Sequence, residues 1–164
     1  MPGLRAIKAL MVAGVALYPL VVAFGNITDY QSNFVFVQHV LSMDTTFPGN
    51  RLMYRAITRP ALQHLAYGLI IAGEAAAGIV LAYGAAALWR ARKASAAEFA
   101  AAKRPALLGG FIAFLVWYVG FLVIGGEWFA MWQSASWNGQ QAAFRILVPF
   151  LLVMLFLMQP EEKA

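Results

Sequence analysis

Hydrophobic residues are gathered into four long runs, which cover approximately residues 6–24, 61–89, 106–124 and 142–158. A helix needs about 20 residues, with a range of roughly 17–25, to cross the hydrocarbon core of a bilayer. The second run is longer than this, so its helix should tilt or protrude at its ends. The pattern predicts an all-α membrane protein in which residues 1–164 form a single domain, a bundle of four transmembrane helices.

The segment between the first two runs, residues 25–60, is too apolar to be a solvated linker. Phe34, Val37 and Leu41 recur at helical spacing, which predicts a short helix along the membrane surface. We expect this outer loop to be structured and to pack on the ends of the helices, because its Phe and Val side chains are unfavourable in water.

Composition agrees with a chain that is surrounded by lipid. Hydrophobic residues make up 62% of the chain and charged residues 12%, against roughly 45–50% and about 25% in soluble domains. There is no cysteine, which excludes thiolate chemistry and cysteine-based metal sites. The net charge of +5 could indicate nucleic acid, but the basic residues flank the apolar runs, so we expect no such partner.

Lysine and arginine are distributed unequally between the two sides of the predicted bundle. Eight lie near the termini or between the second and third runs, and four lie on the other side. Loops rich in these residues stay in the cytoplasm. Both termini are therefore expected to be cytoplasmic, and the outer loop 25–60 is expected to face outward.

Glu74 is the residue that the hydrophobic pattern singles out. It lies thirteen residues after Ala61 and fifteen before Trp89, roughly 20 Å from either end of the run. A comparable ionised Asp at the bilayer centre costs about 2.5–3.5 kcal/mol on insertion scales. We therefore expect Glu74 to face protein and to be neutral at pH 7, with Tyr67 on its face and Tyr118 as a candidate partner. Its role is either functional, in proton handling or ligand contact, or structural, as a hydrogen-bonding group between helices.

Several arginines are expected near the outer ends of the helices. The second spanning helix is expected to begin near Arg51, with a kink or restart at Pro60, so that Arg51, Arg55 and Arg59 would share one face. Such a stripe suits lipid headgroups or an acidic partner. Arg145 is expected either to reach the headgroups or to pair with Glu127.

The two histidines, His39 and His64, are both expected on the outer side. A haem site would need the two histidine rings to face one another at the same depth in the membrane. A metal site would need both histidines to lie close to Asp29 and Asp44. The sequence holds no closely spaced pair of ligands, and both histidines are better explained as hydrogen-bonding groups at the interface. We therefore expect no cofactor and no metal.

Three segments carry a family resemblance. They read GNITDY at residues 25–30, VQHVLSMDTTFP at residues 37–48 and IIAGE at residues 70–74. In these segments the chain resembles a bacterial family of predicted small integral membrane proteins, domain of unknown function 2165. The resemblance covers nearly the whole chain and implies an inner-membrane protein with four spans. It implies no activity, substrate or catalytic residue.

Three functions are compatible with these features. The first is an accessory subunit, not an enzyme, that packs against a larger membrane complex or a second copy, with lipids around it. Small residues suited to close helix packing support it: Gly68, Ala72 and Ala76, and Gly73 and Ala77. The alternative is a small transporter, or a proton- or lipid-handling protein, built around Glu74. The third is a redox protein that binds haem or quinone through His39 or His64.

Overall fold

The computed structural model describes residues 2–161, which form helices and short connections without a strand. Four helical segments in this part of the chain are long and apolar enough to cross a membrane. They are α1 (Pro2–Thr28), α3 (Pro60–Ala91), a third segment made of α4 (Ala96–Ala102), α5 (Arg104–Phe114) and the π-helix η2 (Leu115–Trp128), and α6 (Gln140–Met158). The predicted all-α fold with four spans is confirmed.

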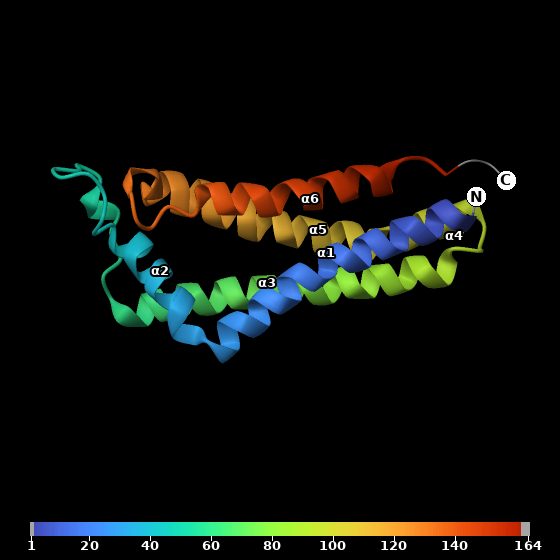
Figure 1. The fold of residues 1–164 in the computed structure, drawn as a ribbon, viewed down its shortest axis with the longest axis horizontal. Helices are drawn as coiled ribbons and strands as arrows, with labels where there is room; N and C mark the ends of the chain where they lie inside the picture. The colour runs from blue at the N-terminus through green and yellow to red at the C-terminus, as the bar shows by residue number, and fades with distance from the viewer. Residues whose placement is uncertain (1, 162–164) are drawn as a thin grey trace.

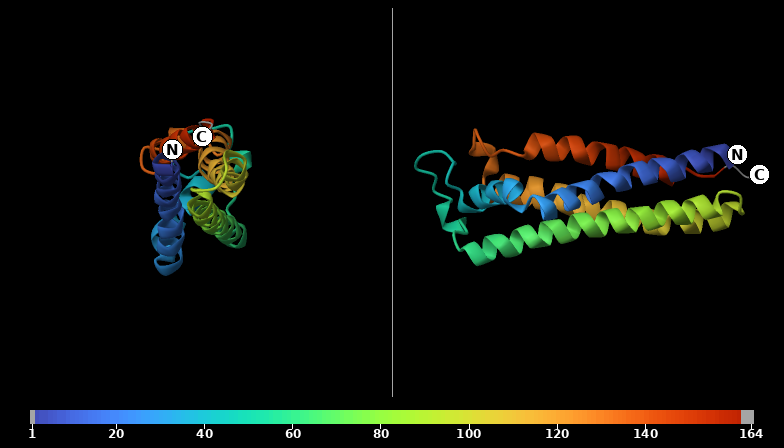
Figure 2. Two further views of the ribbon diagram at one scale, coloured as in Figure 1. Left: turned by 90° about the vertical axis from the view of Figure 1, so that its right-hand side faces the viewer. Right: turned by 60° about the horizontal axis from the view of Figure 1, so that its bottom comes forward.

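The helices form an elongated bundle in which α1 lies beside α3 and α6 lies beside α5 (Figure 1). The described ends of the chain lie together at one end of the bundle, with the connection between α3 and α4 (Figure 2). We call this the terminal end. The opposite end, which we call the loop end, carries α2 (Tyr30–Ser42), η1 (Met53–Arg55) and η3 (Met131–Gln133).

Close packing along α3 depends on glycine. A Cβ atom added to Gly84 would lie 2.5 Å from the backbone nitrogen of Ala106, and one added to Gly78 would lie 2.6 Å from Cγ of Leu20. Separations this short are not tolerated by real side chains, so α3 can approach α5 and α1 only where it has no side chain. Small residues allow the same close approach in other membrane bundles.

The predicted short helix in the outer loop is present as α2, and its apolar residues pack on the bundle. Phe34, Val37 and Leu41 are buried, in a cluster that also contains Tyr67 and Phe129. This cluster is separate from the larger core that fills the rest of the bundle. The loop end therefore has a hydrophobic core of its own.

The second spanning helix begins at Pro60, and the prediction that it begins near Arg51 is wrong. Residues 51–59 form a turn, the short helix η1 and an extended stretch. The proline ring disfavours helical geometry in the residue before it, and Arg59 is extended, with φ −76° and ψ 118°. Proline is well suited to the first turn of a helix, and α3 starts at Pro60.

Candidate functional site

Glu74 lies on α3 and faces protein, as the sequence predicts. Its exposed fraction is 2%. Asn26 of α1 donates a hydrogen bond from Nδ2 to Oε2 of Glu74 at 2.8 Å, and Asn33 of α2 donates from Nδ2 to Oδ1 of Asn26 at 2.7 Å. Three helices thus contribute one chain of hydrogen bonds, and we call these residues the Glu74 chain.

The Glu74 chain borders a cavity of about 220 Å³ between α1, α2, α3, η2 and α6. We call it the polar cavity. Most of its lining side chains are apolar or aromatic. Tyr18 of α1 and Ala142 of α6 line the cavity and are also exposed, so its wall reaches the surface of the bundle at these two helices.

Glu74 lies nearer to the loop end than the length of its hydrophobic run predicts. Tyr18 of α1 contacts Phe150 of α6, with ring centroids 6.5 Å apart. The two helices are antiparallel, so Asn26, about two turns beyond Tyr18, is level with the first turn of α6. Since α3 continues toward the loop end beyond the start of α6, the middle of α3 is not the middle of the bundle.

Tyr67 and Tyr118, the two tyrosines expected near Glu74, differ in position. Tyr67 lines the polar cavity with an exposed fraction of 1%, and its hydroxyl is buried without a hydrogen-bond partner in residues 2–161. Tyr118 is 41% exposed and stacks on Phe114. It follows Trp117, which faces the cavity, so its own side chain points outward. The prediction that Tyr118 is a partner of Glu74 is wrong.

A second cavity of about 210 Å³ adjoins the first. Its lining contains only apolar and aromatic residues and glycine, and we call it the apolar cavity. The two cavities share four lining residues: Phe36, Val37, Ile70 and Phe121. The polar and the apolar cavity therefore lie against the same side chains of α2, α3 and η2.

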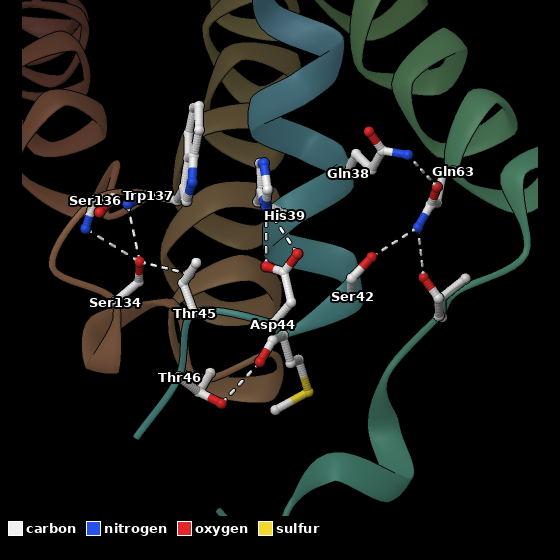
Figure 3. Close-up of polar contacts among 12 residues, drawn as sticks. Gln38, His39, Ser42, Asp44, Thr45, Thr46, Gln63, Ser134, Ser136 and Trp137 are labelled. Carbon is white, nitrogen blue, oxygen red and sulfur yellow. Dashed lines mark hydrogen bonds and ion pairs between the residues drawn. The ribbon is translucent and has the colours of Figure 1, made fainter. Parts of the chain in front are cut away.

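Polar contacts fix the connections at the loop end (Figure 3). His39 hydrogen-bonds through Nδ1 to Oδ2 of Asp44 at 2.8 Å, and its ring stacks on Trp137 at 4.5 Å. The hydroxyls of Thr45 and Ser134 are 2.7 Å apart. The Thr45–Ser134 bond and the His39–Trp137 contact join the region of α2 to the connection before α6.

Gln63, near the start of α3, ties the same region to the second spanning helix (Figure 3). Its Nε2 donates to Oγ of Ser42 at 3.0 Å and to the carbonyl of Ile57 at 2.8 Å. Its exposed fraction is 1%. A buried amide needs such partners, so Gln63 has a structural role that its sequence position did not reveal.

The structure does not bring the histidines together. His64 hydrogen-bonds through Nδ1 to the hydroxyl of Tyr30 at 2.8 Å and stacks on Phe34 at 4.1 Å, whereas His39 contacts Asp44. Asp29 accepts a hydrogen bond from Ser32. Within residues 2–161 no group of three potential metal ligands is clustered.

Two arrangements predicted for the outer arginines, the Arg145–Glu127 ion pair and the arginine stripe, are absent from the described structure. Arg145 and Glu127 are both exposed and make no ion pair with one another in the described structure. Arg51, Arg55 and Arg59 share no helical face, because the segment that holds them is not an α-helix. Arg55 instead donates to the Trp128 carbonyl at 3.1 Å and lies over its ring at 4.5 Å.

A buried ion cluster at the terminal end escaped the sequence analysis. Arg5, Lys8 and Lys103 all contact the carboxylate of Glu161, at 3.3, 2.7 and 2.8 Å respectively. Both lysines also donate to the Gln159 carbonyl at 3.0 Å. We call these residues the Glu161 cluster. The sequence signal was an acidic residue just after the last apolar run, on the side rich in basic residues.

The Glu161 carboxylate is held in its charged form. Burial raises its pKa, but hydrogen bonds from Lys103 and Lys8 and the charges of these two lysines outweigh burial and lower the pKa to about 2. The cluster therefore joins the start of α1, the beginning of α5 and the chain after α6 at neutral pH.

A family model described as a predicted small integral membrane protein, DUF2165, matches residues 4–160. Neither the curated proteins nor the solved structures contain a significant match to the chain.

Proposed function

This chain belongs to the DUF2165 family of predicted small integral membrane proteins, and from its site we propose that it binds a small amphiphilic molecule of the membrane. The family description states no activity, so the proposal depends on the chemistry of the two cavities. The Glu74 chain and Tyr67 would hold a polar head, and the apolar cavity would receive an apolar tail. This corresponds to a small transporter or a lipid-handling protein rather than an enzyme.

The hydroxyl of Tyr67 is the observation that carries the proposal. It is buried at the polar cavity without a partner in the described part of the chain. A buried polar group left without a hydrogen bond costs about 1–3 kcal/mol. Such an exception needs an explanation, and a ligand that bonds to the hydroxyl supplies one.

The dimensions of the site indicate the size of the ligand. Pockets for drug-sized molecules measure roughly 300–1,000 Å³, and the polar cavity measures about 220 Å³. It therefore suits a head group, and the adjoining apolar cavity provides space for the rest of the molecule. A ligand would enter from the surrounding lipid between α1 and α6, where exposed residues line the polar cavity.

An accessory-subunit role stays a prediction with less support. Part of the small-residue pattern that motivated it is used inside the chain, because a Cβ on Gly73 would meet Val116 at 2.8 Å and Ala77 is fully buried. Gly68 and Ala72 remain exposed. They leave one small-residue face for a membrane partner.

We also propose that the protein lies in a bacterial inner membrane with both termini in the cytoplasm. The excess of lysine and arginine at the terminal end supports this orientation. A reporter fused to the C-terminus should be active only in the cytoplasm, and one placed after Gly139 only outside it. The opposite pattern would reverse the orientation.

Native mass spectrometry of protein released from native-membrane nanodiscs tests the binding proposal. We expect the wild type to retain a small molecule, and Ala143→Phe to lose it. Ala143 is buried and lines the polar cavity, so a phenyl ring there fills the space without touching the Glu74 chain. Protein without any bound small molecule would contradict the proposal.

The matched control is Ala72→Phe. Ala72 is exposed on α3 and lines neither cavity, so this variant should keep the bound molecule. Ile146→Trp, at a partly buried position in the cavity wall, replaces Ala143→Phe if that variant does not fold. Retention of the molecule by a folded cavity-filled variant would place the ligand elsewhere.

A further inference from the structure

The ionisable side chains that line the polar cavity indicate which charge its ligand carries. Among its lining side chains, Glu74 is the only acid and none is a lysine, an arginine or a histidine. An anion would therefore meet a carboxyl group and no positive partner. A cation would meet the one group that can neutralise it in a medium of low polarity.

Aromatic rings add to this character. Five of them line the same cavity: Tyr18, Phe36, Tyr67, Trp117 and Phe121. The face of an aromatic ring attracts a cation, and rings grouped around a pocket are the usual means of binding quaternary ammonium ions. The rings and the carboxyl group thus favour the same kind of ligand.

The carboxyl group also has an oxygen available. Asn26 donates to Oε2 of Glu74, and no hydrogen bond inside residues 2–161 involves Oε1. The Asn26 amide is itself held by Asn33, so the carboxyl group is fixed in orientation while one of its oxygens is free to contact a ligand.

We infer that the head group bound in the polar cavity is an organic cation, held between the Oε1 atom of Glu74 and the surrounding aromatic rings. This inference rests on the proposed function and specifies its ligand class. Small ammonium compounds that carry an apolar substituent have the required chemistry. The apolar substituent lies in the apolar cavity under α2.

Binding is coupled to a proton. A carboxylate without a cation is costly in a medium of low polarity, so we expect Glu74 to carry a proton in the empty protein and to release it to the solvent when a cation binds. The other titratable side chains that line the cavity are Tyr18 from α1 and Tyr67 from α3, whereas the lining residues from α2, η2 and α6 are not titratable. Glu74 is therefore the group that exchanges the proton.

A pair of compounds with the same shape tests the inference. Benzyltrimethylammonium is a cation, and neopentylbenzene is its neutral counterpart with carbon in place of nitrogen. We expect wild-type protein in zwitterionic nanodiscs to bind the cation saturably and at least tenfold more tightly than the neutral compound. Ala72→Phe should behave like wild type, and Glu74→Gln should lose at least tenfold in affinity for the cation only.

The pH dependence of cation binding provides a second measurement on the unmodified protein. Affinity should rise with pH by up to tenfold per unit, because binding releases a proton. Equal binding of both compounds, or Glu74→Gln binding the cation as wild type does, would overturn the cation inference while leaving the proposed function intact. Absence of any bound molecule from native membranes and of binding by either compound would overturn both.

Discussion

The two ends of the bundle place a buried carboxyl group in opposite environments. At the terminal end, Glu161 contacts three cationic side chains, and two of them share a further carbonyl acceptor. At the loop end, Glu74 receives one hydrogen bond from an amide and borders a cavity whose lining includes Tyr67, a residue with a buried hydroxyl that has no partner in the described structure. One carboxyl group is fully occupied by the chain, and the other is held in place but left available.

This difference separates a structural role from a binding role. A buried carboxylate surrounded by cations is already neutralised, and removing any partner leaves charge buried without compensation. A carboxyl group that is oriented by one amide and adjacent to space can accept a new partner without losing an old one. We therefore expect substitutions at the terminal end to change stability, and substitutions at the loop end to change binding.

The largest effect is expected from Glu161→Gln. The substitution leaves Arg5, Lys8 and Lys103 near one another without the carboxylate that neutralises them. Breaking a buried ion pair from one side typically costs roughly 3–5 kcal/mol. Unfolding in mixed detergent micelles should show a loss of this order. Arg90→Gln, on the same end at an exposed position without an ion pair in the described structure, should change stability little.

The contribution of Glu161 should also depend on pH in a defined window. Its pKa is about 2 in the folded protein, against an ordinary value of 4.5. A lowered pKa stabilises the fold above the ordinary value, and the stabilisation disappears as pH falls through the folded value. The difference in unfolding midpoint between wild type and Glu161→Gln should be constant above about pH 4.5 and shrink toward pH 2. A difference that vanishes already at pH 5 would contradict the ion cluster.

The spans could be predicted from sequence because the hydrophobic runs and the thickness of a bilayer determine them. The start of α3 was harder to predict, because it depends on one residue, Pro60, and not on the hydrophobic pattern. Pro60 could have been recognised as the start of α3, since proline suits a first turn and restricts Arg59 before it. The arginine stripe was instead inferred by extending helical spacing through a segment that is not helical.

The partners of buried polar residues could not be predicted, because they come from distant parts of the chain. Glu74 was singled out by its place in an apolar run, but Asn26, on another helix, gave no comparable signal. Lys8 and Lys103 were counted as part of the charge that orients the protein, and their bonds to Glu161 depend on how the starts of α1 and α5 lie relative to the chain after α6. Periodicity identifies the buried face of a helix but not which helix faces it.

Substitutions of Glu74 should separate its structural role from its binding role. Glu74→Leu removes the acceptor for the Asn26 amide and leaves that donor buried, which costs about 1–3 kcal/mol. Glu74→Gln keeps an acceptor, so we expect stability within roughly 0.5 kcal/mol of wild type together with the loss of cation binding. If Glu74→Gln folds normally and binds as wild type does, Glu74 serves only as a structural hydrogen-bond acceptor.

A small effect, and the only stabilising one, is expected from Tyr67→Phe. The hydroxyl of Tyr67 has no partner in the described structure, so its removal should relieve a desolvation penalty and stabilise the ligand-free protein by about 1 kcal/mol. The ring contacts with Tyr30 and Phe34 would remain. The same variant should bind its ligand more weakly, because the head group loses a hydrogen bond.

Tyr18→Phe is the matched control, since Tyr18 lines the cavity but is partly exposed. Measurements of both unfolding and ligand binding test whether Tyr67→Phe raises stability while it lowers affinity. A Tyr67→Phe protein that is less stable than wild type would show that the hydroxyl already has a hydrogen-bond partner.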